Sequence, residues 1–276
     1  MRNLVIVIII LAVAGLAYYL GQRSSEPADS TAAVEPVTAN SSVNNAAPAP
    51  EPVKYPVNRT VSVATQASGN PIAPPLPELD QSDESIRQAL AGLYSPLQLN
   101  NLFIFESVVR HFVVTVDNMT SAKLPQKYRV NRLPADKFLV KKDASGEIYI
   151  DAANYTRYTA YVELLEAIDL NRLVDLYFNF YPLFQRAYEE LGYPDRYFND
   201  RLVEVVDHLL AAPDVRDPVK LLQPVVYYTF ADPDLEQLSA GQKLMLRIGH
   251  DNAARVKSWL RRLRSELTNM HRASGQ

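Results

Sequence analysis

One group of residues in the sequence has a spacing suited to acid–base chemistry. Glu204 precedes Asp207 by three positions and His208 by four, so in a helix all three lie on adjoining parts of one face. A carboxylate placed there would orient the imidazole as a general base. We favour the alternative of a solvated helix surface with an ordinary ion pair, because such triplets are common on helices. The sequence therefore leans toward a protein that is not an enzyme.

The other residue types exclude several kinds of site. The four histidines lie far apart, without metal-ligand spacing, and there is no cysteine, so we predict no metal site, no disulfide and no cofactor. The run Gly241-Gln242-Lys243 resembles the end of a phosphate loop, but the upstream glycine is missing and Leu244 replaces the required hydroxyl residue. We predict instead that Ser239 and Gln242 form a capping box at a helix start. We interpret Asn199-Asp200-Arg201 likewise as a helix start with a local salt bridge.

Basic residues gather in two segments. Lys and Arg number 28 against 31 Asp and Glu, for a net charge of -3, which gives no overall attraction to nucleic acid. We hypothesise that the two basic segments share a face that binds anionic lipid headgroups or a cell-wall polymer. The residues expected there are Lys123, Lys127, Arg129, Arg132, Arg255, Lys257 and Arg261. No stacking aromatics alternate with this charge, so nucleic acid is not an expected partner.

Tyrosines form a further candidate surface. Tyr155, Tyr158 and Tyr161 lie near Arg157, an arrangement on which a sugar could stack. Aromatic residues at helical spacing are more often part of a core, so we favour packing.

The first element that must position any site is an apolar segment. From Leu4 to Leu20 every residue is aliphatic, small or tyrosine, and as a helix this segment is about 25 Å long, within the range that spans a bilayer. We predict a retained single transmembrane helix within an anchor of residues 1–23. The alternative is a cleaved signal peptide, with Gly15-Leu16-Ala17 as the cleavage region.

A spacer is predicted to follow the anchor. Residues 24–78 hold ten of the nineteen prolines among alanine, serine and threonine, a composition typical of a disordered, partly polyproline II linker. Arg2 and the terminal amine face Arg23 across the span, which favours a cytoplasmic N-terminus by a small margin. By analogy with other chains that carry such linkers, we place the folded domain in the periplasm and the anchor in the bacterial inner membrane.

Residues 79–270 are predicted to form a mainly α-helical, compact multi-helix domain with a small β-hairpin or short sheet, followed by a tail over residues 271–276. The expected helices cover 83–94, 97–117, a run starting after Asp169 and interrupted or kinked at Pro182, 199–210, and one long last helix to about Leu267. The expected strands are 138–142 and 147–150, joined as a hairpin, and 225–230 beside them.

Three stretches resemble one bacterial membrane-anchored family, which carries the uncharacterised domain of unknown function 3014. They are Tyr181 to Gly192, Tyr197 to Leu202 and Leu238 to Lys243. The resemblance covers roughly Leu79 to Leu267 and implies a shared fold and an envelope setting, but no catalytic residues.

Together these features predict a membrane-anchored envelope protein with a noncatalytic binding or scaffolding domain. Two alternatives stay open at this point. One is an enzyme that acts on an envelope polymer through carboxylates that the sequence does not identify, and the other is an accessory subunit of a membrane complex, with another envelope protein as its partner.

Overall fold

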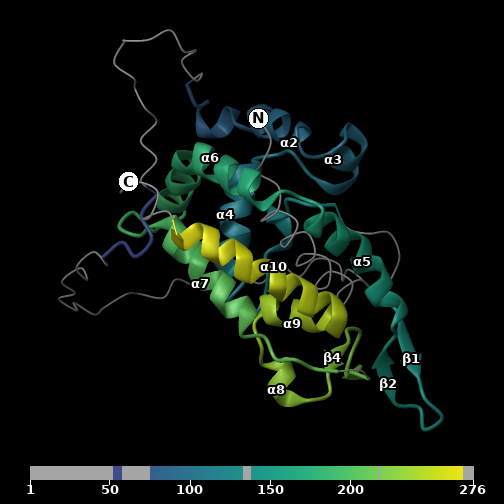
Figure 1. Ribbon diagram of the computed structural model, residues 1–276. Coiled ribbons are helices and arrows are strands. Elements are labelled where there is room, and N and C mark those ends of the chain that lie inside the picture. The colour runs from purple at the N-terminus through teal and green to yellow at the C-terminus, as the bar shows by residue number, and fades with distance from the viewer. Residues whose placement is uncertain (1–51, 58–74, 133–137, 217, 270–276) are drawn as a thin grey trace, which may run out of the picture.

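The computed structural model describes residues 52–57, 75–132, 138–216 and 218–269. These residues form nine α-helices, two short 3-10 helices and a four-stranded antiparallel sheet (Figure 1). The predicted mainly helical domain with a short sheet is confirmed. The predicted transmembrane segment, Leu4 to Leu20, lies outside the described residues, and within them no helix combines the length and apolar character needed to cross a bilayer.

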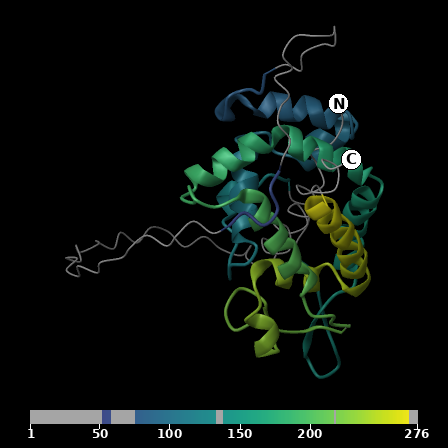
Figure 2. The ribbon, with the colours of Figure 1, turned by 60° about the vertical axis from the view of Figure 1, so that its left-hand side comes forward.

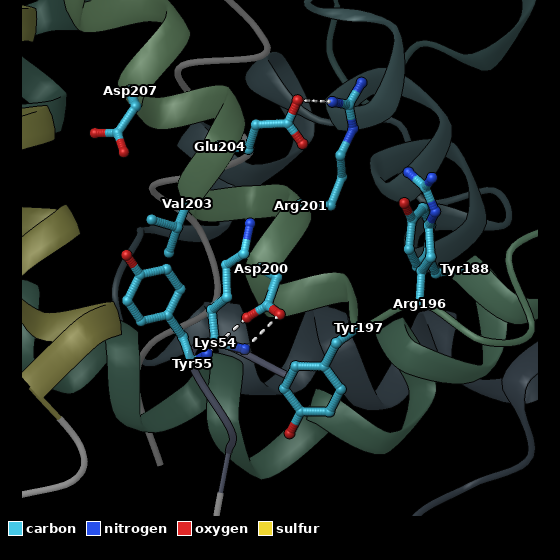
Figure 3. A pocket seen from close by; sticks show the side chains of 10 residues that line it. All are labelled: Lys54, Tyr55, Tyr188, Arg196, Tyr197, Asp200, Arg201, Val203, Glu204 and Asp207. Carbon is cyan, nitrogen blue, oxygen red and sulfur yellow. Dashed lines mark hydrogen bonds and ion pairs between the residues drawn. The ribbon is translucent and has the colours of Figure 1, made fainter. Parts of the chain in front are cut away.

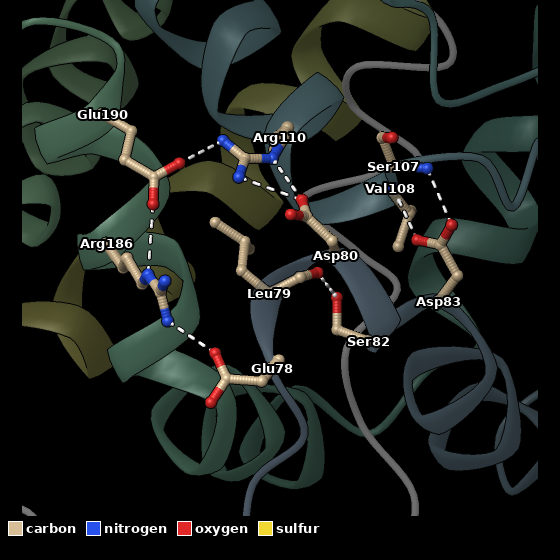
Figure 4. A network of polar contacts seen from close by, with 10 residues as sticks. All are labelled: Glu78, Leu79, Asp80, Ser82, Asp83, Ser107, Val108, Arg110, Arg186 and Glu190. Carbon is tan, nitrogen blue, oxygen red and sulfur yellow. Dashed lines mark hydrogen bonds and ion pairs between the residues drawn. The ribbon is translucent and has the colours of Figure 1, made fainter.

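The first helices are short, and one of them, α4, is capped by a side chain of another. They are η1 (Leu79–Gln81), α2 (Asp83–Ala91), α3 (Pro96–Leu102) and α4 (Val108–Asn118). The prediction of one helix over 97–117 is wrong, because the chain turns at Ser107, which is left-handed with φ 49°. The Asp83 carboxylate accepts hydrogen bonds from the N–H groups of Ser107 and Val108, at 2.7 and 2.8 Å (Figure 4). A side chain of α2 thus satisfies N–H groups that α4 cannot pair within its own first turn.

Three longer helices follow: α5 (Ala153–Glu166), α6 (Leu170–Glu190) and α7 (Phe198–Leu210). The Asp169 carboxylate caps α6 by accepting the N–H groups of residues 171 and 172, as predicted. Pro182 lies inside one continuous helix and does not start a second segment. Gly192, at φ 118°, ends α6 in the conformation expected of it.

A chain of ion pairs joins the start of the domain to α4 and α6 (Figure 4). Arg110 of α4 binds both Asp80 of η1 and Glu190 of α6. Arg186 of α6 binds Glu190 and Glu78, at 3.1 and 2.8 Å. These exposed pairs add little stability individually, but together they connect η1 and the residue before it to α4 and α6.

The last third contains β3 (Lys220–Leu222), β4 (Thr229–Phe230), α8 (Pro233–Glu236), α9 (Ala240–Arg247) and α10 (His250–Thr268). The predicted single last helix is in fact two, α9 and α10, which meet at Gly249, where φ is 86° and ψ is 154°. The predicted strand over 225–230 is reduced to Thr229 and Phe230, because Val225, 81% exposed, lies in the loop before it. The capping box is half confirmed: the Ser239 hydroxyl accepts the Gln242 N–H, whereas the Gln242 amide donates to the His208 carbonyl.

The sheet has the order β1-β2-β3-β4, in which β1 is Val140–Lys142 and β2 is Ile148–Ile150. The predicted hairpin is confirmed, with Val140 opposite Ile150. A small apolar cluster beneath the sheet includes Ile150, Leu221 and Phe230, with Leu246 of α9.

The main core lies between the helices. α10 packs on α5, α6, α7 and α9, and α4 packs on α6 and α7, as the turned view shows (Figure 2). Phe112, Phe184 and Phe198 contact one another there, with ring centroids 5.1 to 6.0 Å apart. Trp259 of α10 is fully buried. Phe198 is the first residue of α7, so the start of this helix, with the polar residues that follow Phe198, is anchored in the core.

Candidate functional site

Residues 52–57, which we call the strap, lie against the start of α7. They fall within the predicted linker, more than a hundred positions before the residues that hold them. The Asp200 carboxylate accepts the backbone N–H groups of Lys54 and Tyr55, at 2.8 and 2.7 Å (Figure 3). The Tyr197 hydroxyl accepts the N–H of Val57 at 2.6 Å. The strap is thus bound through consecutive parts of its main chain.

A fourth hydrogen bond completes this main-chain recognition. The side-chain amide of Asn199 donates to the Tyr55 carbonyl at 2.9 Å. Asn199 is fully buried, and it is oriented by the Tyr177 hydroxyl, which donates to its amide oxygen at 3.3 Å. A buried amide with its partners in place is rigid, so the strap binds a preformed group. We call Tyr197, Asn199 and Asp200 the strap site.

The strap also contributes apolar contacts. Tyr55 and Val57 are half-buried and pack against the main core. The pKa of Arg264 on α10 is raised first by its hydrogen bond to Asp207 and to a smaller extent by Tyr55. Backbone recognition and side-chain packing therefore act on the same short segment.

A pocket of about 250 Å³ adjoins the strap. Lys54 and Tyr55 form one wall, and the opposite walls come from α7 and the loop before it (Figure 3). Its charged lining residues on that side are Arg196, Asp200, Arg201, Glu204 and Asp207. The strap and the start of α7 thus border a polar depression that is open beside the strap.

Arg201 is the central cation of this surface. It donates to the Asp117 carboxylate at 2.9 Å and forms an ion pair with Glu204 at 2.8 Å. It also donates to the Asp117 carbonyl and the Thr120 hydroxyl. Burial opposes its charge, but the pairs with Glu204 and Asp117 outweigh this and raise its pKa. The salt bridge predicted at the helix start instead joins Arg201 to Glu204, three residues later, and to Asp117 of α4, while Asp200 binds the strap.

The structure does not bring the predicted triplet together into an acid–base set. Glu204 pairs with Arg201, and Asp207 pairs with Arg264 of α10. His208 instead approaches the Ser239 hydroxyl at 2.7 Å and does not line the pocket. The three side chains thus have three different partners.

The contact between His208 and Ser239 was not predicted. Ser239 is buried and caps α9 with the same hydroxyl, so the contact joins α7 to α9. Burial lowers the pKa of His208, and the positive charge of Arg201 lowers it further. A ring nitrogen of the neutral imidazole can accept a hydrogen bond from the Ser239 hydroxyl, which fits a structural role.

The predicted basic face is spread over separate elements. Lys123, Lys127, Arg129 and Arg132 lie between α4 and β1, where Arg132 donates to the Asn100 carbonyl at 2.8 Å. On α10, Arg255 pairs with Glu166, Lys257 donates to the Ala212 carbonyl, and Arg261 is exposed. A shared anion-binding face stays a hypothesis.

Two further expectations concern packing and metals. Tyr158 is fully buried, while Tyr155 and Tyr161 pack against the two apolar clusters. The prediction that these tyrosines belong to the core, and do not form a sugar-stacking surface, is confirmed. Over residues 52–57, 75–132, 138–216 and 218–269, no three histidine or acidic side chains are grouped so that they could hold a metal ion.

The strap site was missed by sequence reasoning. Asn199 and Asp200 were identified only as a helix start, and the one local signal in the linker is that Tyr55 is its sole aromatic residue. Two comparisons with known proteins, against curated proteins and against solved structures, found no match. A third, against family models, matched the model described as a protein of unknown function (DUF3014) over residues 108–264, more than half of the chain.

Proposed function

Because the chain belongs to the DUF3014 family, whose function is unknown, we propose a function from its own geometry: a membrane-tethered, noncatalytic binding module of the bacterial envelope. The observation that carries the binding role is the polar depression at the start of α7. It combines a rigid, main-chain-binding amide and carboxylate, Asn199 and Asp200, with an open pocket. Such a concave surface with a few fixed polar groups is the usual form of a ligand site.

The paired carboxylates favour binding over catalysis. Glu204 and Asp207 both line the pocket, yet each is already bound to an arginine. A carboxylate that transfers protons must reach the reacting atom itself. Here the arginines hold these groups as parts of a fixed charged surface.

Tethering rests on the apolar segment Leu4 to Leu20 and on the proline-rich spacer after it. With the N-terminus in the cytoplasm, the binding domain stands in the periplasm. Fusion of alkaline phosphatase to the C-terminus tests this topology, and we expect activity in intact cells. An inactive fusion of full length would contradict it.

Site-specific photocrosslinking in the native host tests the binding role. A photoreactive residue at Glu204, whose side chain is 63% exposed beside the pocket, should yield a discrete crosslinked product in the membrane fraction. The matched control carries the same group at Lys141, exposed on β1. Absence of product from Glu204, or the same product from both positions, would count against the α7 surface as the ligand site.

A further inference from the structure

The strap site has the chemistry of a receptor for an extended peptide. Of the four strap residues from Lys54 to Val57, three donate backbone N–H groups to α7 or to the residue before it. The fourth, Pro56, has no N–H to donate. The proline therefore stands at the one position of this segment that requires no acceptor.

The donors and acceptors match the main chain and not particular side chains. Asp200 binds two successive N–H groups, and Asn199 binds the carbonyl of the second. Carboxylate-to-amide hydrogen bonds are charge-assisted and stronger than neutral ones. The same arrangement with Asp83 caps α4 within the domain, so the question is whether the strap is a fixed brace or an exchangeable ligand.

Three observations favour exchange. The strap precedes the described helices in the chain and is connected to them through residues 58–74. Lys54 is exposed and Tyr55 only half-buried, whereas Val108, the second residue held by Asp83, is buried and begins a core helix. The strap also lines only one wall of the open pocket, which leaves room there for a longer chain.

We infer that the strap site is an exchangeable receptor for an extended peptide of the form Lys-Tyr-Pro-Val, and that residues 52–57 are the occupant that the chain itself supplies. This inference rests on the proposed binding function and names its ligand class and its regulation. A partner segment with an aromatic residue before proline would displace the strap. Because the strap is tethered close by, its effective concentration is on the order of millimolar, and it suppresses weak competitors.

The experiment uses the purified full chain and a fluorescein-labelled peptide with the sequence of residues 51–58. Lys54→Pro combined with Tyr55→Pro removes the two N–H groups that Asp200 binds and so releases the strap without changing α7. Fluorescence anisotropy should show that this variant binds the peptide at least about 10-fold more tightly than the wild-type chain, since the tethered competitor is gone. The proline control is Val53→Pro, which leaves both N–H groups in place and should behave as the wild type.

A second substitution locates the binding. Asp200→Asn in the strap-released chain should weaken peptide binding by about 10-fold or more, because two charge-assisted hydrogen bonds are lost. Asp195→Asn, at an exposed position before α7, should have no such effect. Hydrogen exchange of the Lys54 and Tyr55 amides in the unaltered chain should be slow and should become fast in Asp200→Asn.

Two outcomes would overturn the inference. Slow exchange of these amides without peptide binding to the released chain would identify the strap as a fixed brace. Fast exchange in the unaltered chain would mean that the strap is not bound at all. Slow exchange without peptide binding, together with a discrete crosslinked product from Glu204, would overturn this inference and leave the proposed binding function standing. Because Lys54 and Tyr55 line the pocket, fast exchange together with no crosslinked product would overturn both, so the two failures are distinguishable.

Discussion

The junction between α9 and α10 allows a stability prediction with an internal control. Gly249 has φ 86° and ψ 154°, a region that is essentially restricted to glycine, so Gly249→Ala costs about 1–3 kcal/mol in backbone strain. The added Cβ would also lie 2.6 and 2.7 Å from Cγ and Cδ1 of the Tyr155 ring on α5. These two atoms cannot move aside unless the whole Tyr155 ring is displaced, and such overpacking costs about 1–3 kcal/mol.

We therefore expect Gly249→Ala to lower the free energy of unfolding by about 2–6 kcal/mol, from strain and overpacking together. Gly146→Ala is the matched control, because φ there is 84° but nothing lies within 4 Å of the added Cβ. Its cost should be only about 1–2 kcal/mol. The difference between the two measures the contact with Tyr155 together with any greater backbone strain at Gly249.

Urea unfolding followed by tryptophan fluorescence is a suitable assay. Trp259 is the only tryptophan of the chain and is fully buried in α10, so its emission reports on the helix that begins at Gly249. Equal losses in the two variants would refute the argument, since it would mean that the Tyr155 ring does not constrain this junction.

Two further predictions concern α7. Asp117→Ala should destabilise the domain by about 1–3 kcal/mol, because it leaves the largely buried Arg201 with the exposed Glu204 as its carboxylate partner, and adding Arg201→Met should restore part of this loss in the same urea assay. Since burial lowers the pKa of His208 below its ordinary value of 6.5, its contribution is present above about pH 6.5 and is lost as the pH falls, when the unfolded chain takes up the proton first. His208→Gln should thus lose less stability than the wild type between about pH 7.5 and about pH 5.5, and equal losses in chemical denaturation would contradict this role.

Local patterns predicted the elements of the domain better than their junctions. The cap at Asp169, the stop at Gly192 and the hairpin before α5 depend on neighbouring residues, so the sequence alone reveals them. The break at Gly249 was missed, because apolar residues keep helical spacing on both sides of it and one glycine does not exclude a helix. Helix α5 itself was not predicted, since its buried and exposed side chains do not form one clear stripe.

The candidate site was harder to predict, for a different physical reason. Each strap contact joins residues 140 or more positions apart, and no periodicity in either segment encodes such a pairing. The carboxylates of Glu204 and Asp207 were placed correctly on one helix surface, but their arginine partners lie partly on another element. Sequence spacing thus identified the surface of α7 and not what it binds.

Docking of the strap also sets how far the helical domain can travel from its proposed anchor. With the strap bound, only residues 21–51 separate Leu20 from the domain, a reach of about 90 Å if fully extended. With the strap displaced, residues 21–74 become available and the reach grows to about 160 Å. Capture of a competing peptide would then free additional linker residues, so occupancy of one small site would decide how far from that anchor the domain can reach.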